Sequence, residues 1–386
     1  MPKPRTTPTP KPIAIDLALQ GGGSHGAFTW GVLDRLLEDE TLSFAAVSGT
    51  SAGALNAAVM ATGWARGGRV AARAALAAFW HDIGAAGSCF GAPVPAGFAV
   101  PGLVPPGLAT YNLDWNPAYL WMNQFLRLFS PYQFNPHGDN PLRKVLAEHV
   151  QCEVLKDSAF PLYVTATAVR TGQPRVFDHA DLSIDALLAS ACLPQLFKAQ
   201  PVPLPDRAPR PGLRPARPPR GSGSVAEPHL PGRIEHYWDG GYSGNPALWP
   251  LIYGTESLDL LLVRINPLVR PDLPDTPAEI TDRVNEIGFN ATLLGELRAI
   301  AFIQKLVAEG RIDPKEYKNL RMHMVSDDHA LAPLSPSSKM NTDPAFLKAL
   351  FDLGRVAADT WWLVNRKHLG KQPTLDIHQT FLTQAA

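Results

Sequence analysis

Residues 13–58 read IAIDLALQGGGSHGAFTWGVLDRLLEDETLSFAAVSGTSAGALNAA, and this stretch decides the fold. The apolar run at 13–20 predicts a buried parallel strand. Over residues 26–40 the apolar side chains recur at helical spacing, which predicts an amphipathic helix. A second strand is expected at 44–48, and the small residues after Ser51 predict a helix packed tightly on the sheet. This alternation of strands and helices indicates an α/β fold with parallel strands and right-handed crossovers.

Composition excludes several classes of protein. The 386 residues are 45% hydrophobic, and 35 Lys plus Arg balance 35 Asp plus Glu, so no overall field attracts nucleic acid. Cys89, Cys152 and Cys192 show no CxxC spacing and are expected to be reduced and structural. The sequence shows no apolar signal segment and no apolar run of membrane-spanning length. We expect a cytoplasmic protein, with peripheral contact to a membrane left open.

A glycine loop, GGGSHG, follows the first predicted strand. Glycine permits positive φ and a close approach of backbone N–H groups to an anion, and the start of the next helix adds a favourable dipole. The loop is therefore a candidate anion cradle. Its candidate residues are Gly21, Gly22, Gly23, Ser24 and Gly26.

A second motif, GTSAG, occupies residues 49–53 at the next turn from strand to helix. In a Gly-x-Ser-x-Gly elbow the sharp turn exposes the serine hydroxyl, and the flanking Gly49 and Gly53 avoid clashes that a Cβ would cause. Ser51 is thus a candidate nucleophile. It needs a base, because a serine hydroxyl is a poor nucleophile until its proton is removed.

A distant DGG motif supplies the candidate base. Asp239 precedes Gly240 and Gly241 and follows two aromatic residues, which fits a carboxylate at a strand end. Taken alone, an Asp-Gly pair is typical of an ordinary turn. None of the eleven histidines stands in a compelling context for a base.

The order of these three motifs resembles the patatin-like phospholipase family. VTATAVRTGQPRVF at 164–177, ASACLPQLF at 189–197 and NPAL at 245–248 also resemble that family, so that the likeness covers residues 13–266. It implies a three-layer fold, in which a central, mostly parallel sheet lies between helices and a helical C-terminal extension follows.

The resemblance also implies the chemistry. Ser51 and Asp239 would form a dyad without histidine that cleaves a lipid or other acyl ester through an acyl-enzyme, with no metal and no cofactor. Backbone N–H groups of the glycine loop would hold the oxyanion. Many relatives carry arginine where this chain has His25, so support of the oxyanion by imidazole charge, and hence by pH, is a hypothesis here.

The organisation expected from the sequence has four parts. Residues 1–12 form a disordered tail and 13–270 a patatin-like catalytic domain, within which the Pro- and Arg-rich stretch 201–233 is a disordered insertion. Residues 271–386 form a helical region packed on that domain, with helices at 276–310 and 343–366.

The aromatic stretch at 111–134 contains a predicted helix. Core packing competes there with an acyl-chain groove or a membrane-facing lid.

Other functions stay open. The glycine loop also matches a dinucleotide fingerprint, although no acidic residue ends the second strand, and no lysine follows to make a phosphate-binding P-loop. An α/β-hydrolase triad would use His329, His368 or His378. A silent scaffold that binds lipid or polymer granules is the non-enzyme alternative.

Overall fold

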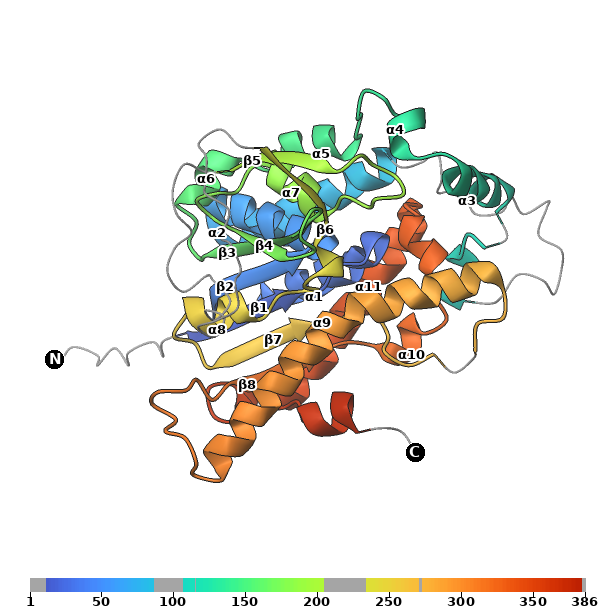
Figure 1. Cartoon of the computed structure of the whole chain (residues 1–386). Helices are drawn as coiled ribbons and strands as arrows, with labels where there is room; N and C mark the ends of the chain where they lie inside the picture. Colours follow the sequence, from blue (N-terminus) through green and yellow to red (C-terminus); the bar gives the residue numbers. More distant parts are fainter. Residues whose placement is uncertain (1–11, 87–106, 115, 205–233, 271–272, 384–386) are drawn as a thin grey trace, which may run out of the picture.

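The fold is known from a computed structural model, drawn in Figure 1, which describes residues 12–86, 107–114, 116–204, 234–270 and 273–383. The predicted N-terminal tail, Cys89 and most of the predicted insertion lie outside these residues. No helix in these ranges is long and apolar enough to cross a membrane.

A single sheet of eight strands organises the described chain, in the order β5-β6-β3-β2-β1-β7-β8, with β4 paired to β3. β3, β2, β1, β7 and β8 run parallel to one another, while β4 and β6 pair antiparallel with β3, and β5 pairs antiparallel with β6. The strands are β1 (Ile13–Leu19), β2 (Leu42–Thr50), β3 (Leu162–Ala168), β4 (Pro174–Asp178), β5 (Gln200–Pro203), β6 (Ile234–Asp239), β7 (Asp259–Val263) and β8 (Arg321–Val325).

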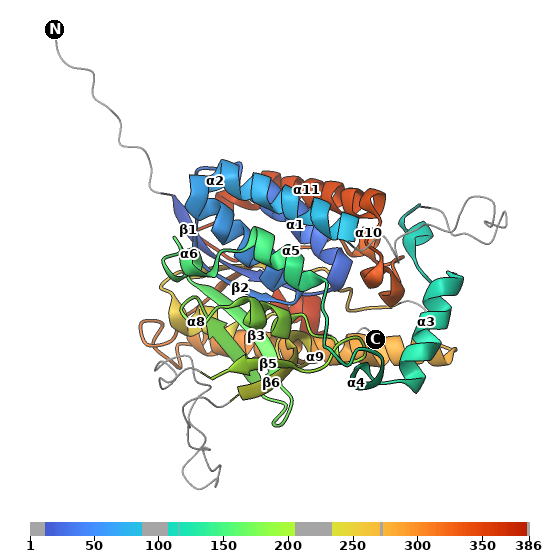
Figure 2. The same cartoon turned by 90° about the horizontal axis from the view of Figure 1, so that it is seen from above.

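Helices cover both faces of this sheet. The α-helices are α1 (Gly26–Leu36), α2 (Ala52–Ala86), α3 (Pro117–Leu128), α4 (Pro131–Phe134), α5 (Leu142–His149), α6 (Cys152–Lys156), α7 (Ile184–Ser190), α8 (Trp249–Gly254), α9 (Pro277–Ala308), α10 (Asp328–Leu331) and α11 (Pro344–Asn365). Short 3-10 turns include η1 (Gly23–His25), η3 (Gly240–Tyr242) and η4 (Pro336–Met340). Figure 2 shows α1, α2 and α11 on one side of the sheet and α8 and α9 on the other.

The alternating direction of the side chains along β1 explains why the sheet has a hydrophobic core on each face. Leu17 packs into the core below α1, α2 and α11, whereas Ala18 packs with residues of α8 and α9. Successive side chains of a strand point to opposite faces, so a strand covered on both faces is apolar at nearly every position. The expected α/β architecture with flanking helices is confirmed.

Two expectations need correction. The sequence predicts an irregular stretch from residue 201, yet Pro201–Pro203 belongs to β5, which pairs with β6. β5 is an edge strand, and prolines are tolerated at an edge because one row of N–H groups there has no partner strand. The mostly helical region after residue 270 also contributes β8, which extends the sheet beside β7.

The aromatic stretch does not form core at α3. That helix has no buried residue, and Trp121 and Leu128 expose 70% and 77% of their surface. Core packing was therefore the wrong interpretation for α3. Figures 1 and 2 both show α3 beside the N-terminal end of α9.

Candidate active site

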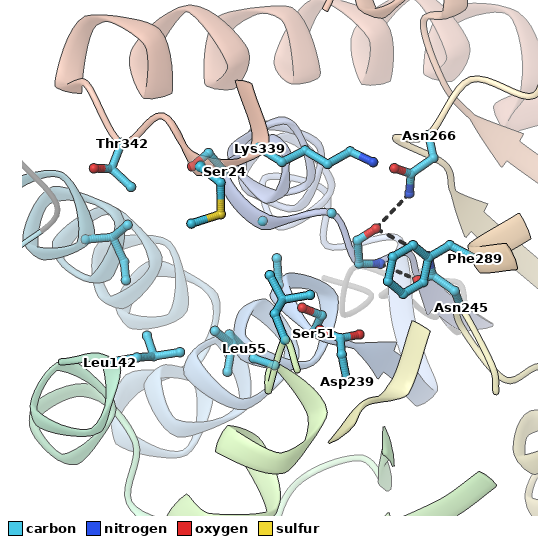
Figure 3. Close-up of a pocket in the computed structure, with 18 of the residues that line it drawn as sticks. Ser24, Ser51, Leu55, Leu142, Asp239, Asn245, Asn266, Phe289, Lys339 and Thr342 are labelled. Carbon is cyan, nitrogen blue, oxygen red and sulfur yellow. Dashed lines mark hydrogen bonds between the residues drawn. The ribbon is translucent and has the colours of Figure 1, made fainter. Parts of the chain in front are cut away.

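A cavity of about 300 Å³ opens where β1, β2 and β6 end. The glycine loop, Ser51 and Asp239 all line it, so the structure brings the three predicted motifs together. Most of the remaining lining is apolar, including Leu55 and Leu142, which Figure 3 shows across the cavity from Asn266. A concave, mostly apolar site with a few convergent polar groups is typical of small-molecule sites.

The turn after β2 holds Ser51 in an uncommon conformation. Its φ of 51° makes it the one non-glycine residue with positive φ in the described chain. The Ser51 N–H donates to Ser190 Oγ at 2.9 Å, and the Ser190 hydroxyl donates to the Thr165 carbonyl at 2.6 Å. A Cβ on Gly53 would overlap the Leu19 carbonyl, so glycine is required for α2 to start this close to β1. The strain at Ser51 is thus held in place by its neighbours, as is common at functional sites.

Asp239 ends β6 and is 3% exposed. Burial raises its pKa to about 6, although the Gly241 N–H, the Ser51 hydroxyl and the charge of Lys339 all act to lower it. The Gly241 N–H donates to Oδ1 at 2.7 Å, and Figure 3 shows Ser51 next to the same carboxylate. A carboxylate with a pKa of about 6 can accept a proton near neutral pH.

The glycine loop contributes fewer free donors than expected. The Gly21 N–H donates to Asn245 Oδ1 at 2.7 Å, and the Gly26 N–H is bonded to carbonyls of its own turn. Within the described ranges, the N–H groups of Gly22, Gly23 and Ser24 have no hydrogen-bond partner. The predicted set of donors therefore narrows to these three residues.

Residues that the sequence did not single out hold this loop in position. Asn266 Nδ2 donates to the Gly21 carbonyl at 2.7 Å, so Asn245 and Asn266 bond both backbone polar groups of Gly21. Gln20 Oε1 accepts from the N–H groups of Ile265 and Asn266, at 2.9 Å each. The position of Asn266 just beyond the end of β7 was a usable signal, because the ends of neighbouring parallel strands meet at one edge.

The DGG glycines are needed for close packing. A Cβ on Gly240 would overlap the Thr165 carbonyl, and one on Gly241 would overlap the ring of Phe289. Phe289 belongs to α9 and lines the cavity. The region after residue 270 therefore forms part of the site.

His25 is buried and is absent from the residues that line the cavity. The Ser338 hydroxyl donates to the Ser335 carbonyl at 2.6 Å, so His25 Nε2 must donate to Ser338 Oγ, 2.8 Å away. Burial lowers the pKa of His25 well below its usual range. A neutral imidazole does not support the hypothesis that His25 charge stabilises an oxyanion.

The histidines of the alternative triad lie elsewhere. His329, His368 and His378 are absent from the cavity lining, within the chain that the structure describes. Among the residues that the structure describes, Asp82, Glu148 and His149 lie close enough together to hold a metal ion. They also lie outside the cavity. His149 Nε2 already bonds Asp82 Oδ2 at 2.7 Å, so a hydrogen bond between side chains explains this group.

Comparison with known proteins agrees with the arrangement of the motifs. A family model described as patatin-like phospholipase matches residues 17–252. Among solved structures, VipD from Legionella pneumophila matches over 90% of this chain and 67% of its own, with 13% identity and a TM-score of 0.32. No curated protein matches the chain. The family model spans more than half of the sequence and includes all three motifs, and the chain therefore belongs to the patatin-like phospholipase family.

Proposed function

We propose that this protein is a serine lipid acyl hydrolase of the phospholipase A, lysophospholipase or esterase type, with Ser51 as nucleophile and Asp239 as base. The observation that carries the proposal is the placement of Ser51 beside Asp239 in the lining of a mostly apolar cavity (Figure 3). A serine needs a base within hydrogen-bond reach, and this carboxylate meets that need. Family membership supports a lipid acyl ester as the substrate.

The proposed reaction has two halves. Ser51 Oγ attacks the ester carbonyl while its proton passes to Asp239, and the carbonyl oxygen becomes an oxyanion. The free N–H groups of Gly22 and Gly23 stabilise that charge. Collapse expels the alcohol, which takes the proton from Asp239, and leaves an acyl-enzyme. Water then attacks the acyl-enzyme with Asp239 again as base, so the route uses neither metal nor cofactor.

The cavity gives the substrate two unlike sides. Leu55, Leu142 and other apolar residues line one side, where an acyl chain would bury its methylene groups. Asn245 and Asn266 lie on the other and suit the polar alcohol portion of the ester (Figure 3).

The test is hydrolysis of a p-nitrophenyl ester series, and of phospholipid and lysophospholipid vesicles, by wild type, Ser51→Ala and Asp239→Asn. Loss of activity in both variants, with folding verified by circular dichroism, supports the dyad. Equal activity of Ser51→Ala and wild type would contradict it. The triple variant of His329, His368 and His378 to Ala is the control for a triad, and should remain active.

A scaffold function predicts a different result. A folded wild type that hydrolyses no ester and takes no label from a serine-directed fluorophosphonate probe would favour a silent lipid- or polymer-granule-binding protein.

Peripheral membrane contact is the second part of the proposal. Trp121 and Leu128 on α3 and Val284 on α9 expose at least 62% of their surface, and α3 lies beside the N-terminal end of α9 in Figures 1 and 2. The charges of both Arg127 on α3 and Lys339 in the cavity wall act on Asp282 of α9, so this apolar face adjoins the cavity. Exposed aromatic and aliphatic side chains next to a lipid cavity suit a bilayer surface.

Vesicle binding tests this surface. The double variant Trp121→Ser/Leu128→Ser should sediment less with phosphatidylcholine vesicles and keep its activity on a soluble short-chain ester. Val356→Ser/Leu363→Ser removes exposed apolar groups from α11 as the matched control. Equal sedimentation of both double variants would contradict contact through α3.

A further inference from the structure

Lys339 lies in the cavity wall, on the turn η4 that covers the glycine loop. A Cβ on Gly23 would overlap the Lys339 carbonyl, so the two backbones are in close contact. η4 is anchored by its neighbours: Ser338 bonds His25, and Ser337 Oγ accepts from the Leu113 N–H at 2.8 Å. The backbone that carries Lys339 is thus fixed against the loop that is proposed to hold the oxyanion.

The Lys339 amine has no partner of its own. In the ranges that the structure describes, it makes no hydrogen bond and no ion pair, although the residue is partly buried. Nearby Arg270 is different, because it pairs with Glu286 at 2.5 Å. Figure 3 shows the Lys339 side chain extended toward Asn266, on the polar side of the cavity. An unpaired cation beside an apolar cavity is unfavourable for stability, which points to a use in function.

The charged groups around Lys339 are few and unequal in effect. Burial lowers the pKa of Lys339, and Arg270 acts in the same direction, whereas Glu286 and Asp282 on α9 and Asp239 on β6 favour the ammonium form. The charge of Lys339 in turn acts to lower the pKa of Asp239. The other titratable neighbours of Asp239 are Cys192 and Tyr242, on which its negative charge acts.

We propose that Lys339 is a positioning residue for the reaction, a fixed cation that stabilises first the Asp239 carboxylate and then the oxyanion. This rests on the proposed function. When the Ser51 proton moves to Asp239, the new Oγ–C bond displaces the carbonyl π electrons onto oxygen. One negative charge therefore moves from Asp239 to the substrate oxygen beside the glycine loop. A cation placed near both positions stabilises the charge before and after it moves, without rearrangement.

The experiment is the pH dependence of kcat/KM on a neutral p-nitrophenyl ester for wild type, Lys339→Met and Lys339→Arg. Lys339→Met should lower kcat on the order of tenfold and move the acid limb up by about one pH unit, with little change in KM. Lys339→Arg should return the acid limb of the pH profile to its wild-type position and restore most of kcat. Lys318→Met is the control, because Lys318 is also partly buried but donates to Thr255 and Leu251 away from the cavity.

A second readout does not depend on catalysis. The pH dependence of the stability difference between wild type and Asp239→Asn reports the Asp239 pKa, and it should move up by the same amount when Lys339→Met is added to both proteins. Lys339→Gln serves if Lys339→Met does not fold. An unmoved Asp239 pKa in this readout overturns the inference. So does a higher KM with an unchanged acid limb, which would indicate that Lys339 acts in substrate binding instead of on the charge of Asp239. Failure of the proposed function would appear separately, as activity that survives Ser51→Ala.

Discussion

Two buried aspartates, one at each end of the sheet, differ in how many hydrogen-bond donors surround them and in the direction in which their pKa is shifted. Asp239 at the cavity receives one N–H, from Gly241, and lies beside the Ser51 hydroxyl, and burial raises its pKa to about 6. Asp259 at the start of β7 receives Arg321 through two nitrogens, at 3.0 and 2.6 Å, as well as His323 and the Gly370 N–H.

The partners of Asp259 hold its pKa well below its usual range, despite burial. A buried carboxylate that is fully paired is inert and structural, whereas one left short of partners keeps affinity for a proton. The comparison teaches that the number of donors, rather than burial, separates a base from a structural ion.

The largest expected effect concerns activity. Asp239→Asn should lower kcat/KM on the order of a thousandfold, because the amide cannot take the Ser51 proton. Asp259→Asn should leave kcat/KM within about threefold of wild type, since that site is remote from the cavity. Both are measured by ester hydrolysis at a temperature where circular dichroism shows folded protein. Comparable losses in the two variants would break the comparison.

The free energy of unfolding should show the reverse order, with the larger loss in Asp259→Asn. Asp259→Asn leaves Arg321 and His323 without their anion and should lower the free energy of unfolding by about 3 kcal/mol, as is usual when one partner of a buried ion pair is removed. Urea unfolding at pH 7 measures this. Because the folded pKa of Asp259 is depressed, its contribution is present above about pH 4 and is lost as the pH falls further. A deficit that persists unchanged at pH 2 would contradict the ion-pair account.

Asp239→Asn should instead stabilise the protein at neutral pH. The folded pKa of Asp239 is about 6 against an ordinary value of 3.8, so the folded state loses stability as the pH rises between these values. The full penalty, about 3 kcal/mol, is present above pH 6 and disappears near pH 4. Urea unfolding of both proteins at pH 4, 6 and 8 tests the sign. A variant less stable than wild type at pH 8 would show that Asp239 is a structural carboxylate after all.

The pH profile of activity is a smaller effect with the same origin. Wild-type kcat/KM should rise about tenfold per pH unit up to a pH of about 6 and then level off, as the base loses its proton. Asp259→Asn should show the same midpoint. A midpoint near 4 for wild type would mean that the carboxylate is better solvated than its burial indicates.

The smallest expected effect concerns the backbone strain at Ser51. At φ 51°, Ser51→Gly should be more stable than Ser51→Ala by about 1 kcal/mol, because only a Cβ is strained in the left-handed region. Both variants lack the hydroxyl, so their difference in urea midpoint isolates the backbone. The opposite order would mean that the turn is relaxed.

Much of this site was readable from the chain alone. GGGSHG, GTSAG and DGG each carry their own local geometry, because glycine permits turns and contacts that other residues cannot make. Asn245 and Asn266 escaped notice, because the position of an amide at a strand end does not say which carbonyl or N–H it bonds. The edge strand β5 escaped for a similar reason, because its Pro-rich residues form a strand only through pairing with β6.

By itself the sequence determined the α/β alternation, the elbow at Ser51 and the carboxylate at Asp239, because strand and helix periodicity and glycine turns are local properties. Tertiary structure decided the rest. It brought Asn245, Asn266 and Lys339 to the loop after β1. It also gave the N–H groups of Gly21 and Gly26 hydrogen-bond partners, so that they are not free donors. Finally, it left Asp239 with few hydrogen-bond partners and surrounded Asp259 with them. Proton affinity and free donors depend on groups that are distant in sequence, and so they are settled only when the chain has folded.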